Sequence, residues 1–342
     1  MEDLVWSELD ILSEEESLEL YGFLSENYVS NKHSEFSLCY SKDFLVWALT
    51  SPGWKKEFHI GLRDKTQNNK LVAFISGIPT SLKQFREIKK NLVVNFLCIN
   101  QNFRTQKLSL LLIEEITKRA IDSGLEQALY TGNTYRPSLE PIISSHYYHK
   151  SLNPKKLQDN RFINTMTPMQ LRLHKLFYSK NTNITNDMRP LEEKDIPTVT
   201  RKLNETNKSF QIAQSFREEE VKHWFLKRNN VVYSYVSKDL SDFVSFYSIS
   251  IATQNENTSI NSSYLFHYYS KNVSTTEKLL KKSLVLAKKE NFDIFNCIDI
   301  GQNTTFIELL NFDKGNATLY YHLYDHKNLP KINKTNLNII LL

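Results

Sequence analysis

The chain has 342 residues, which is long for one core, so we expect two domains or a fused pair. Apolar residues make up 40% of it, and its net charge of +5 is not gathered into a block, which argues against a nucleic-acid-binding protein. The acidic start MEDLVWSELD lacks the apolar core of a signal peptide, and no apolar run approaches the roughly 20 residues of a membrane span. We therefore expect a cytoplasmic protein that does not span a membrane.

The first half reads as a helix, two strands, a second helix and a third strand. Ser13 is a suitable N-cap for a helix in DILSEEESLELYGFLSENYV. KLVAFISGIP predicts a buried strand that ends at Gly77 and Pro79, and LVVNFLCI predicts the next strand. KLSLLLIEEITKRAIDSG has an amphipathic helix pattern with Gly124 as its stop, and LEQALYT follows as a strand.

The second half repeats this order. DFVSFYSIS and SSYLFHYYS predict strands, TTEKLLKKSLVLAKKENF predicts a helix, and DIFNCIDI predicts a third strand. Each motif lies about half the chain after its counterpart, which indicates a duplicated α/β unit. The polar run YSKNTNITND, residues 178–187, is the expected linker. We therefore predict one domain over residues 1–177 and another over 188–342.

A basic loop joins a strand to a helix within NFLCINQNFRTQKLS, residues 95–109. A helix start offers unpaired N–H groups and the positive end of a dipole, and Arg104, Lys107 and Thr105 add charge and a hydroxyl. The loop lacks the glycines of a P-loop or a dinucleotide fingerprint. Two readings stay open on pattern alone: a phosphate or pyrophosphate site, or a helix start with solvated cations.

The three cysteines are too widely spaced for a disulfide framework or a zinc site. Cys39, Cys98 and Cys297 each lie in an apolar or strand-like context. We expect three buried thiols in a reducing compartment and no bound metal.

Several stretches, in the same order across nearly the whole chain, resemble the eukaryotic glycylpeptide N-myristoyltransferase family. They are NFLC with Arg104, Lys107 and LLIEEITKRA, together with ENYV, FLVWALTSPGWKKEFHIGLR, LVAFISGIP, HKSLNPKKL, RPLEEKDIP, HWF, DFVSFYSI and FDIFNCIDI. The resemblance implies two fused, pseudo-symmetric acetyltransferase-like units sharing a saddle-shaped mixed sheet. It implies transfer of myristoyl from myristoyl-CoA to the amino group of an N-terminal glycine, with residues 1–177 holding most of the acyl-CoA and 188–342 most of the peptide.

The resemblance also implies roles in donor binding. Phe96 and Leu97 match the pair whose backbone N–H groups form an oxyanion hole. Cys98 and Ile99 would continue along the thioester arm, and Cys98 is not expected to be a nucleophile because no base adjoins it. The CoA phosphates would meet the loop made of Arg104, Thr105, Gln106, Lys107, Leu108 and Ser109. Lys107 stands where the broader acetyltransferase loop has a glycine.

The catalytic base implied by the resemblance is the C-terminal carboxylate of Leu342. The last residues, NLNIILL, are apolar, which indicates a buried rather than a frayed terminus. Without the resemblance, this run would read simply as a last apolar strand. Asn95 and Thr131 match positions near the glycine amine and are expected to receive or orient its proton.

The remaining matched positions would face the peptide. These expected peptide-binding residues are Tyr28, Phe36, Tyr40, Tyr147, His149, Tyr264 and Asn316.

Three departures from the family pattern bear on binding. The chain begins almost on the VWSELD motif, so an aromatic arm that covers CoA in the family is expected to be missing, which means weaker CoA binding or a truncated chain. Ser30–His33 and Asn316 stand where the family has acidic residues, which predicts a weaker preference for basic peptides. The loop from Gly132 to His146 is unlike the family's, so peptide contacts there stay unassigned.

Two rival functions remain. One is another CoA-dependent N-acyltransferase, such as an acetyltransferase, and the other is an inactive acyl-CoA or lipidated-peptide binding protein. For the N-myristoyltransferase reading we expect a monomer whose partners are CoA and glycine-terminated peptides, with no nucleic acid.

Overall fold

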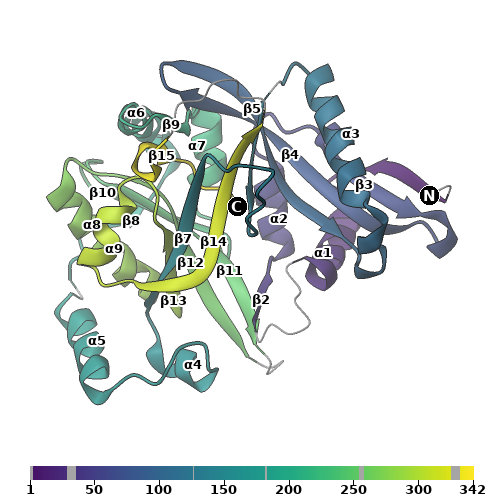
Figure 1. Ribbon diagram of the computed structural model, residues 1–342. Helices are drawn as coiled ribbons and strands as arrows, with labels where there is room; N and C mark the ends of the chain where they lie inside the picture. Colours follow the sequence, from purple (N-terminus) through teal and green to yellow (C-terminus); the bar gives the residue numbers. More distant parts are fainter. Residues whose placement is uncertain (1–2, 29–35, 126, 182, 254–257, 325–331) are drawn as a thin grey trace.

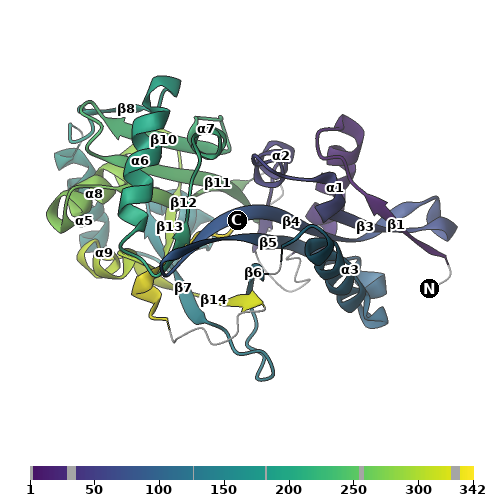
Figure 2. The same cartoon turned by 90° about the horizontal axis from the view of Figure 1, so that it is seen from above.

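The computed structural model describes residues 3–342 except 29–35, 126, 182, 254–257 and 325–331. The described residues form one mixed sheet of 15 strands with helices on both faces (Figures 1 and 2). The main path of the sheet runs β1-β3-β4-β5-β6-β14-β7-β13-β12-β11-β10-β8. The expected α/β class with a large mixed sheet is confirmed.

The first half of the chain supplies seven strands and five α-helices to the described structure. In chain order they are β1 Leu4–Glu8, α1 Glu14–Asn27, β2 Phe36–Cys39, α2 Lys42–Leu49, β3 His59–Asp64, β4 Lys70–Gln84, β5 Glu87–Ile99, α3 Leu108–Asp122, β6 Gln127–Gly132, β7 Ile143–Ser151, α4 Pro154–Asp159 and α5 Pro168–Lys180.

The second half supplies the remaining described elements. In chain order they are β8 Met188–Pro190, α6 Ile196–Asn207, β9 Ile212–Gln214, α7 Glu218–Phe225, β10 Val232–Ser237, β11 Phe243–Thr253, β12 Ser259–Tyr269, α8 Val273–Lys289, β13 Ile294–Ile298, α9 Asn303–Leu309, β14 Asp313–Tyr324 and β15 Leu337–Asn338.

The expected repeat is confirmed by the strand pairing. In the first unit β4 pairs with β5 antiparallel, and β5 then pairs with β6 in parallel after the crossover helix α3. In the second unit β11 and β12 are antiparallel, and β12 pairs with β13 in parallel after α8. The same strand, strand, helix, strand unit therefore occurs twice.

The two units exchange their last strands. Strand β7 comes from the first half of the chain but pairs with β13, whereas β14 comes from the second half and pairs with β6. β14 and β7 also pair with each other at the centre of the sheet. The exchange joins the two units into one continuous sheet, so neither unit completes its sheet with its own part of the chain.

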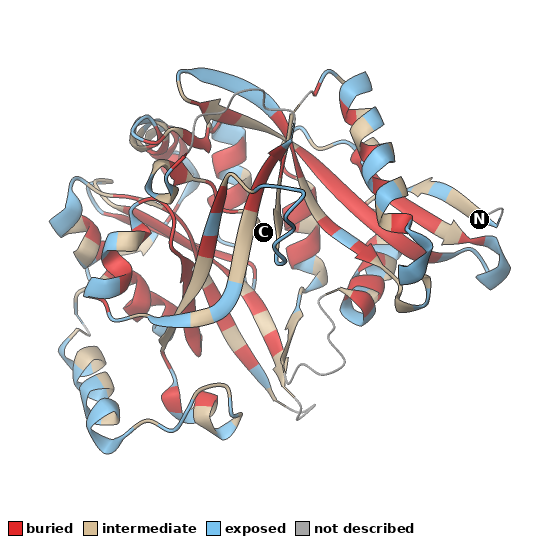
Figure 3. Cartoon of the chain, viewed as in Figure 1, coloured by how far each residue is buried: buried red, intermediate tan, exposed pale blue. Residues whose placement is uncertain are grey.

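The main hydrophobic core lies where the units meet. It contains buried residues of α1, α2, α6 and α7, which cover one face of the sheet. On the opposite face α3 packs on the first unit, and α8 and α9 pack on the second. The buried strands converge on this centre (Figure 3).

Three local expectations are wrong. β4 does not end at Gly77 and Pro79 but runs to Gln84, because its outer part pairs with both β5 and β9. Cys39 is exposed, since it ends the short strand β2, whereas Cys98 and Cys297 are buried. The expected linker begins inside α5, and its Thr185 is buried and accepts a 2.6 Å hydrogen bond from Lys289 Nζ.

The ends of helices α1 and α3 lie where the capping residues in the sequence predicted them. Ser13 accepts a hydrogen bond from the backbone of Glu16 at the start of α1, as expected of an N-cap. Gly124 follows α3 with φ +73°, the left-handed conformation that favours glycine after a helix. Among the described residues, no helix is both long and apolar enough to cross a membrane.

Candidate functional site

Strand β5 is interrupted by a bulge at Phe96 and Leu97. Phe74 pairs with Cys98, but Ser76 pairs with Asn95, so the two residues between lack partners on β4. Phe96 has φ +54°, a left-handed conformation that is costly for a bulky side chain, and its ring is buried. Such strain persists where packing enforces it, and it often marks a functional site.

The same part of β5 also diverges from its other neighbour, β6. The last described pair between them is Val93 with Leu129. Continued in register, Asn95 would stand opposite Thr131, but the described β5–β6 pairing stops before that point, while β6 goes on to pair along its other edge, where Thr131 meets Tyr321 of β14. Among the described residues, the register therefore gives Phe96 and Leu97 no paired residue on either neighbouring strand. Two such adjacent N–H groups can hold a developing oxyanion.

The sequence suggested that the basic loop leads directly into an α-helix, but the structure places a 3₁₀ turn between them. Residues Gln101–Gln106 form a 3₁₀ turn, Lys107 adopts φ +56°, and α3 begins at Leu108. The left-handed residue therefore separates the 3₁₀ turn from the first turn of α3.

The side chains of this loop divide into two groups. Thr105, Gln106 and Lys107 are exposed beside the start of α3, with Ser109 half-buried, whereas Leu108 is fully buried under the helix. Arg104 donates 2.8 Å and 3.4 Å hydrogen bonds to the carbonyl oxygens of Asn27 and Ile99. In this structure Arg104 therefore ties α1 to the end of β5. The phosphate-binding role of the loop stays a prediction.

Cys98 lies beside this loop with its side chain buried. Burial raises the pKa of its thiol to about 12, against the smaller lowering effect of Arg104. The thiol is therefore neutral near neutral pH, which fits the expectation that it is not a nucleophile.

Four of the expected peptide-facing tyrosines gather around the bulge. Tyr28 and Tyr40 lie 5.7 Å and 5.4 Å from Phe96, measured between ring centroids. Tyr147 and Tyr264 lie 6.2 Å apart and pack against the same core. Burial raises the pKa of all four phenols, so they present neutral hydroxyls.

Phe36 is not brought to this group by any contact among the described residues. It lies at the start of β2, and its ring meets Phe162 at 4.8 Å in an edge-to-face contact. The departure at Ser30–His33 lies outside the described residues.

His149 and Asn316 lie together where β14 bulges away from β7. The pairing shifts between Lys314 and Thr318, so Asn316 is unpaired and exposed. His149 bonds to the side-chain oxygen of Asn296, and a Cβ on Gly315 would collide with its ring. Burial lowers the pKa of His149, with the Asn296 contact opposing, so the ring is neutral.

The end of the chain lies near the centre of the molecule (Figures 1 and 2). Ile339 and Ile340 are buried, and Leu342 is half-buried against the same core as the four tyrosines. Tyr321 Oη donates a 3.2 Å hydrogen bond to the carbonyl oxygen of Ile339. The expected burial of the terminal segment is confirmed.

A second set of contacts fixes the start of this segment. Lys334 Nζ lies 2.6 Å from the buried carboxylate of Asp299, which also accepts hydrogen bonds from Ser145 Oγ and the His146 backbone. Strand β15 then pairs with β9, which itself pairs with β4. The tail is therefore tied to both units before it reaches the bulge.

The second unit has a bulge at the equivalent strand, β12, but a side chain of α9 bridges the strands there. β12 has its own bulge, because Val244 pairs with Tyr268 and Phe246 with Leu265. Asn303 of α9 bridges this region by accepting a 2.7 Å hydrogen bond from Tyr268 Oη and donating a 2.9 Å one to Ile298 O.

Sequence reasoning missed Tyr321, Asp299 and Lys334. All three act on the tail through contacts with segments far away in the chain, and no local motif marks them. Their one indirect signal was the apolar run at the terminus. Within the described part of the chain, no group of three or more His, Cys, Asp or Glu side chains is placed to hold a metal ion.

Comparisons with known proteins give consistent matches. Residues 1–142 match the family described as "Myristoyl-CoA:protein N-myristoyltransferase, N-terminal domain", and residues 160–339 match its C-terminal domain. The chain is 36% identical to glycylpeptide N-tetradecanoyltransferase 1 of Arabidopsis thaliana, covering 98% of this chain and 79% of that protein. It is 35% identical to the Plasmodium falciparum enzyme, covering 98% and 82%.

Solved structures show the same relationship. An N-myristoyltransferase of Saccharomyces cerevisiae with bound myristoyl-CoA aligns with a TM-score of 0.88 at 28% identity, over 100% of this chain and 86% of that one. A GCN5-related N-acetyltransferase from Anabaena variabilis aligns with a TM-score of 0.54 at 10% identity, over 94% and 72%. The second similarity is one of fold alone.

Proposed function

This chain belongs to the myristoyl-CoA:protein N-myristoyltransferase family and is an acyltransferase, and we propose that it transfers myristoyl from myristoyl-CoA to the amino group of an N-terminal glycine. The observation that carries the proposal is the bulge at Phe96 and Leu97, because Phe96 belongs to the hydrophobic core against which the end of the chain packs. An acyl transfer to an amine needs an oxyanion site and a base, which the bulge and the terminal carboxylate would supply.

The first unit would hold the donor. The thioester carbonyl would point at the N–H groups of Phe96 and Leu97, with Cys98 and Ile99 along the CoA arm. The pyrophosphate would meet the start of α3 at Thr105–Ser109, where exposed N–H groups and Lys107 favour an anion. About twelve methylenes at roughly 0.8 kcal/mol each set a ceiling near 10 kcal/mol for burying the acyl chain.

The acceptor amine would be activated by the terminal carboxylate of Leu342. An α-amino group has a reference pKa of roughly 7.7–8.0, so it must lose a proton before it attacks. The attack forms the C–N bond and an oxyanion, and collapse breaks the C–S bond and releases CoA as its thiol. Asn95 and Thr131, at equivalent register positions on β5 and β6, would orient the amine and relay its proton.

The peptide would extend from this point over the second unit. The neutral hydroxyls of Tyr28, Tyr40, Tyr147 and Tyr264 would bind backbone amides near the glycine. His149 and Asn316 would meet side chains further along, at the bulge of β14. Phe36 remains a more distant candidate on β2. We further propose a cytoplasmic monomer.

The decisive assay mixes the protein with myristoyl-CoA and a glycine-terminated peptide and follows free CoA thiol and acylated peptide. Turnover is expected with the glycine peptide and not with the same peptide N-acetylated. Equal turnover of acetyl-CoA would favour an acetyltransferase, and tight binding without turnover would show a binding protein.

Extending the chain beyond Leu342 by two glycines tests the base separately. The extension moves the carboxylate away from the amine, so turnover is expected to fall steeply while myristoyl-CoA binding is retained. Full activity of the extended protein would refute the role of the terminus and leave the overall reaction intact.

A further inference from the structure

Helices α4 and α5 form a lobe, residues 153–181, that projects from the second unit away from the candidate site (Figure 1). The lobe contains six lysines and arginines and one aspartate, a net charge of +5 that equals that of the whole chain. Helix α5 itself contains Arg172, Lys175 and Lys180 and no acidic residue. The rest of the chain is therefore neutral on balance, so the expectation that the net charge is not gathered in one part of the chain is wrong: this lobe carries it.

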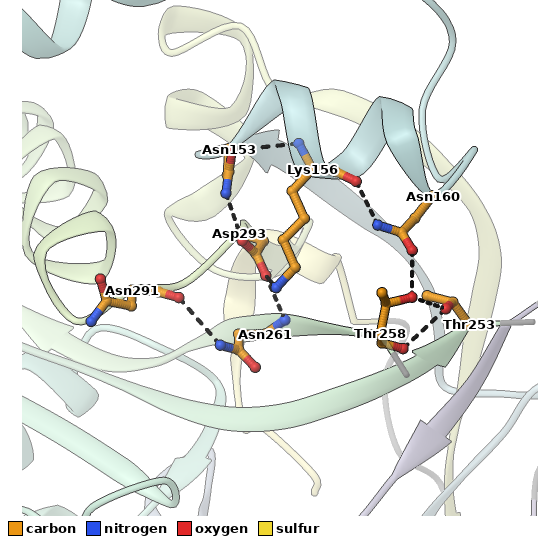
Figure 4. A network of polar contacts seen from close by, with 8 residues as sticks. All are labelled: Asn153, Lys156, Asn160, Thr253, Thr258, Asn261, Asn291 and Asp293. Carbon is orange, nitrogen blue, oxygen red and sulfur yellow. Dashed lines mark hydrogen bonds and ion pairs between the residues drawn. The ribbon is translucent and has the colours of Figure 1, made fainter. Parts of the chain in front are cut away.

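The lobe is held firmly by a polar network (Figure 4). The buried carboxylate of Asp293 lies 2.6 Å from Lys156 Nζ and accepts hydrogen bonds of 3.0 Å from Asn153 Nδ2 and 2.9 Å from the Asn261 backbone. Asn160 accepts a 2.8 Å hydrogen bond from Thr258. These contacts fix α4 on the edge of the second unit.

The inner face of α5 is also anchored. His174 Nε2 lies 3.2 Å from the carbonyl oxygen of Ser151, and Lys288 Nζ lies 4.1 Å from the centre of the Tyr178 ring. The helix begins with a complete capping box between Thr167 and Gln170. α5 is therefore a preformed helix, with one side committed to the protein.

The outer face of α5 is exposed to solvent, yet its centre is apolar. Met169, Leu173 and Leu176 are 62%, 52% and 43% exposed, and their spacing places them on one side of the helix. Figure 3 shows α5 without any buried residue. Arg172 and Lys175 both lie along one side of this stripe and Gln170 lies on the other, and neither cation pairs with a carboxylate in the described part of the chain.

We propose that the outer face of α5 binds an anionic lipid surface. A helix whose exposed face combines an apolar stripe with cations and no acidic residue suits the membrane interface, where the stripe enters the acyl boundary and the cations meet the headgroups. Nucleic acid fits less well, because three exposed apolar side chains at the centre of the face offer nothing to phosphates. This inference does not depend on the proposed reaction.

Vesicle sedimentation tests the proposal on the full chain. The protein is expected to sediment with phosphatidylcholine vesicles containing phosphatidylserine, not with phosphatidylcholine alone, and to dissociate as salt is raised. Changing Met169, Leu173 and Leu176 together to Gln is expected to weaken binding at least about tenfold, as is the pair Arg172→Glu and Lys175→Glu.

A matched control removes three equally exposed apolar side chains elsewhere, by Leu12→Gln, Leu18→Gln and Ile88→Gln. This control should bind vesicles like the unchanged protein, and circular dichroism should show all variants folded. The proposal is overturned if the unchanged protein does not sediment, or if the stripe variant binds as well as the control. Loss of binding in the charge variant alone would show a purely electrostatic site of the kind that nucleic acid uses.

Discussion

The hydroxyl of Tyr321 donates a 3.2 Å hydrogen bond to the carbonyl oxygen of Ile339. Tyr321 lies directly opposite Thr131 in the β14–β6 pair, so the two side chains share one face of the sheet. Ile339 lies three residues before the chain end. This hydrogen bond therefore ties the segment that ends in the terminal carboxylate to β14, the strand that pairs with β6.

Replacing Tyr321 by Phe is expected to lower kcat while leaving the KM for myristoyl-CoA unchanged. The change leaves the buried Ile339 carbonyl without this partner, which costs about 1 kcal/mol and corresponds to roughly fivefold in rate if the tail shifts. Steady-state kinetics with both substrates measures the effect. Tyr320→Phe is the control, because Tyr320 is half-buried and its ring contacts Tyr135 instead. Equal kcat values for the two variants would contradict the positioning role.

The two N–H groups of the bulge predict an unusual mutational pattern at Leu97. Leu97→Ala keeps the N–H, and the side chain is 36% exposed, so activity should be nearly unchanged. Leu97→Pro removes the donor, which is expected to lower kcat by about 100- to 1,000-fold. Myristoyl-CoA binding by calorimetry and the melting temperature show whether the proline variant is folded. Similar activity in the two variants would count against an oxyanion hole here.

The local elements of this fold were predictable because they depend on short-range patterns. Ser13 and Gly124 marked helix ends correctly, and the repeated order of strands and helices was confirmed by pairing. The exchange of β7 and β14 was not predictable, since pairing partners so far apart in sequence leave no local signal. The predicted end of β4 at Pro79 was wrong because proline usually interrupts a strand, whereas here Pro79 stays within the β4–β5 pair opposite Leu92.

The site was predictable in its residues and not in its geometry. The resemblance pointed to Phe96 and to the tyrosines that gather around it, but no sequence pattern indicated the left-handed backbone at Phe96. Nor did it indicate that Arg104 binds the end of α1, because that contact depends on how α1 packs against β5. Tertiary packing decides both features.

We expect a substitution at Asn316 to change the preference for lysine-containing peptides. It is exposed on the β14 bulge beside His149, at a position where the family resemblance implies an acidic residue. Asn316→Asp is expected to increase the kcat/KM ratio of a lysine-containing peptide over its alanine counterpart by about 2- to 5-fold, as an exposed ion pair gives up to about 1 kcal/mol. Raising the salt concentration should remove the gain. An unchanged ratio would place the peptide elsewhere.

Because Asn303 bridges β12 and the end of β13 in the second unit, we expect one chain to bind one acyl-CoA. Asn303 joins Tyr268 of β12 to the backbone at Ile298, where the first unit leaves its strands unpaired. Calorimetric titration with myristoyl-CoA in the absence of peptide should give a single site. Lys107→Glu should weaken that site, because it places a negative charge at the start of α3. A second site of similar affinity would show that the Asn303 bridge opens.

His267 predicts an acid-dependent loss of stability that one substitution reduces. It is buried among Phe216, Phe225 and Phe266, and neither ring nitrogen has a hydrogen-bond partner in the described part of the chain. Burial lowers its pKa from 6.5 to about 3. As pH falls below 6.5 the unfolded chain gains a proton that the folded protein refuses, so the free energy of unfolding decreases by up to about 1.4 kcal/mol per pH unit from this group.

His267→Phe removes this proton difference, so its free energy of unfolding should fall less steeply than that of the unchanged protein between about pH 6.5 and pH 4. Urea denaturation across this range gives both slopes. Phe266→Leu, a non-titrating change in the same cluster, should lower stability by a similar amount at every pH because it only alters packing. Parallel curves for His267→Phe and the unchanged protein would mean that His267 accepts a proton in the folded state, and that the aromatic cluster opens to water in acid.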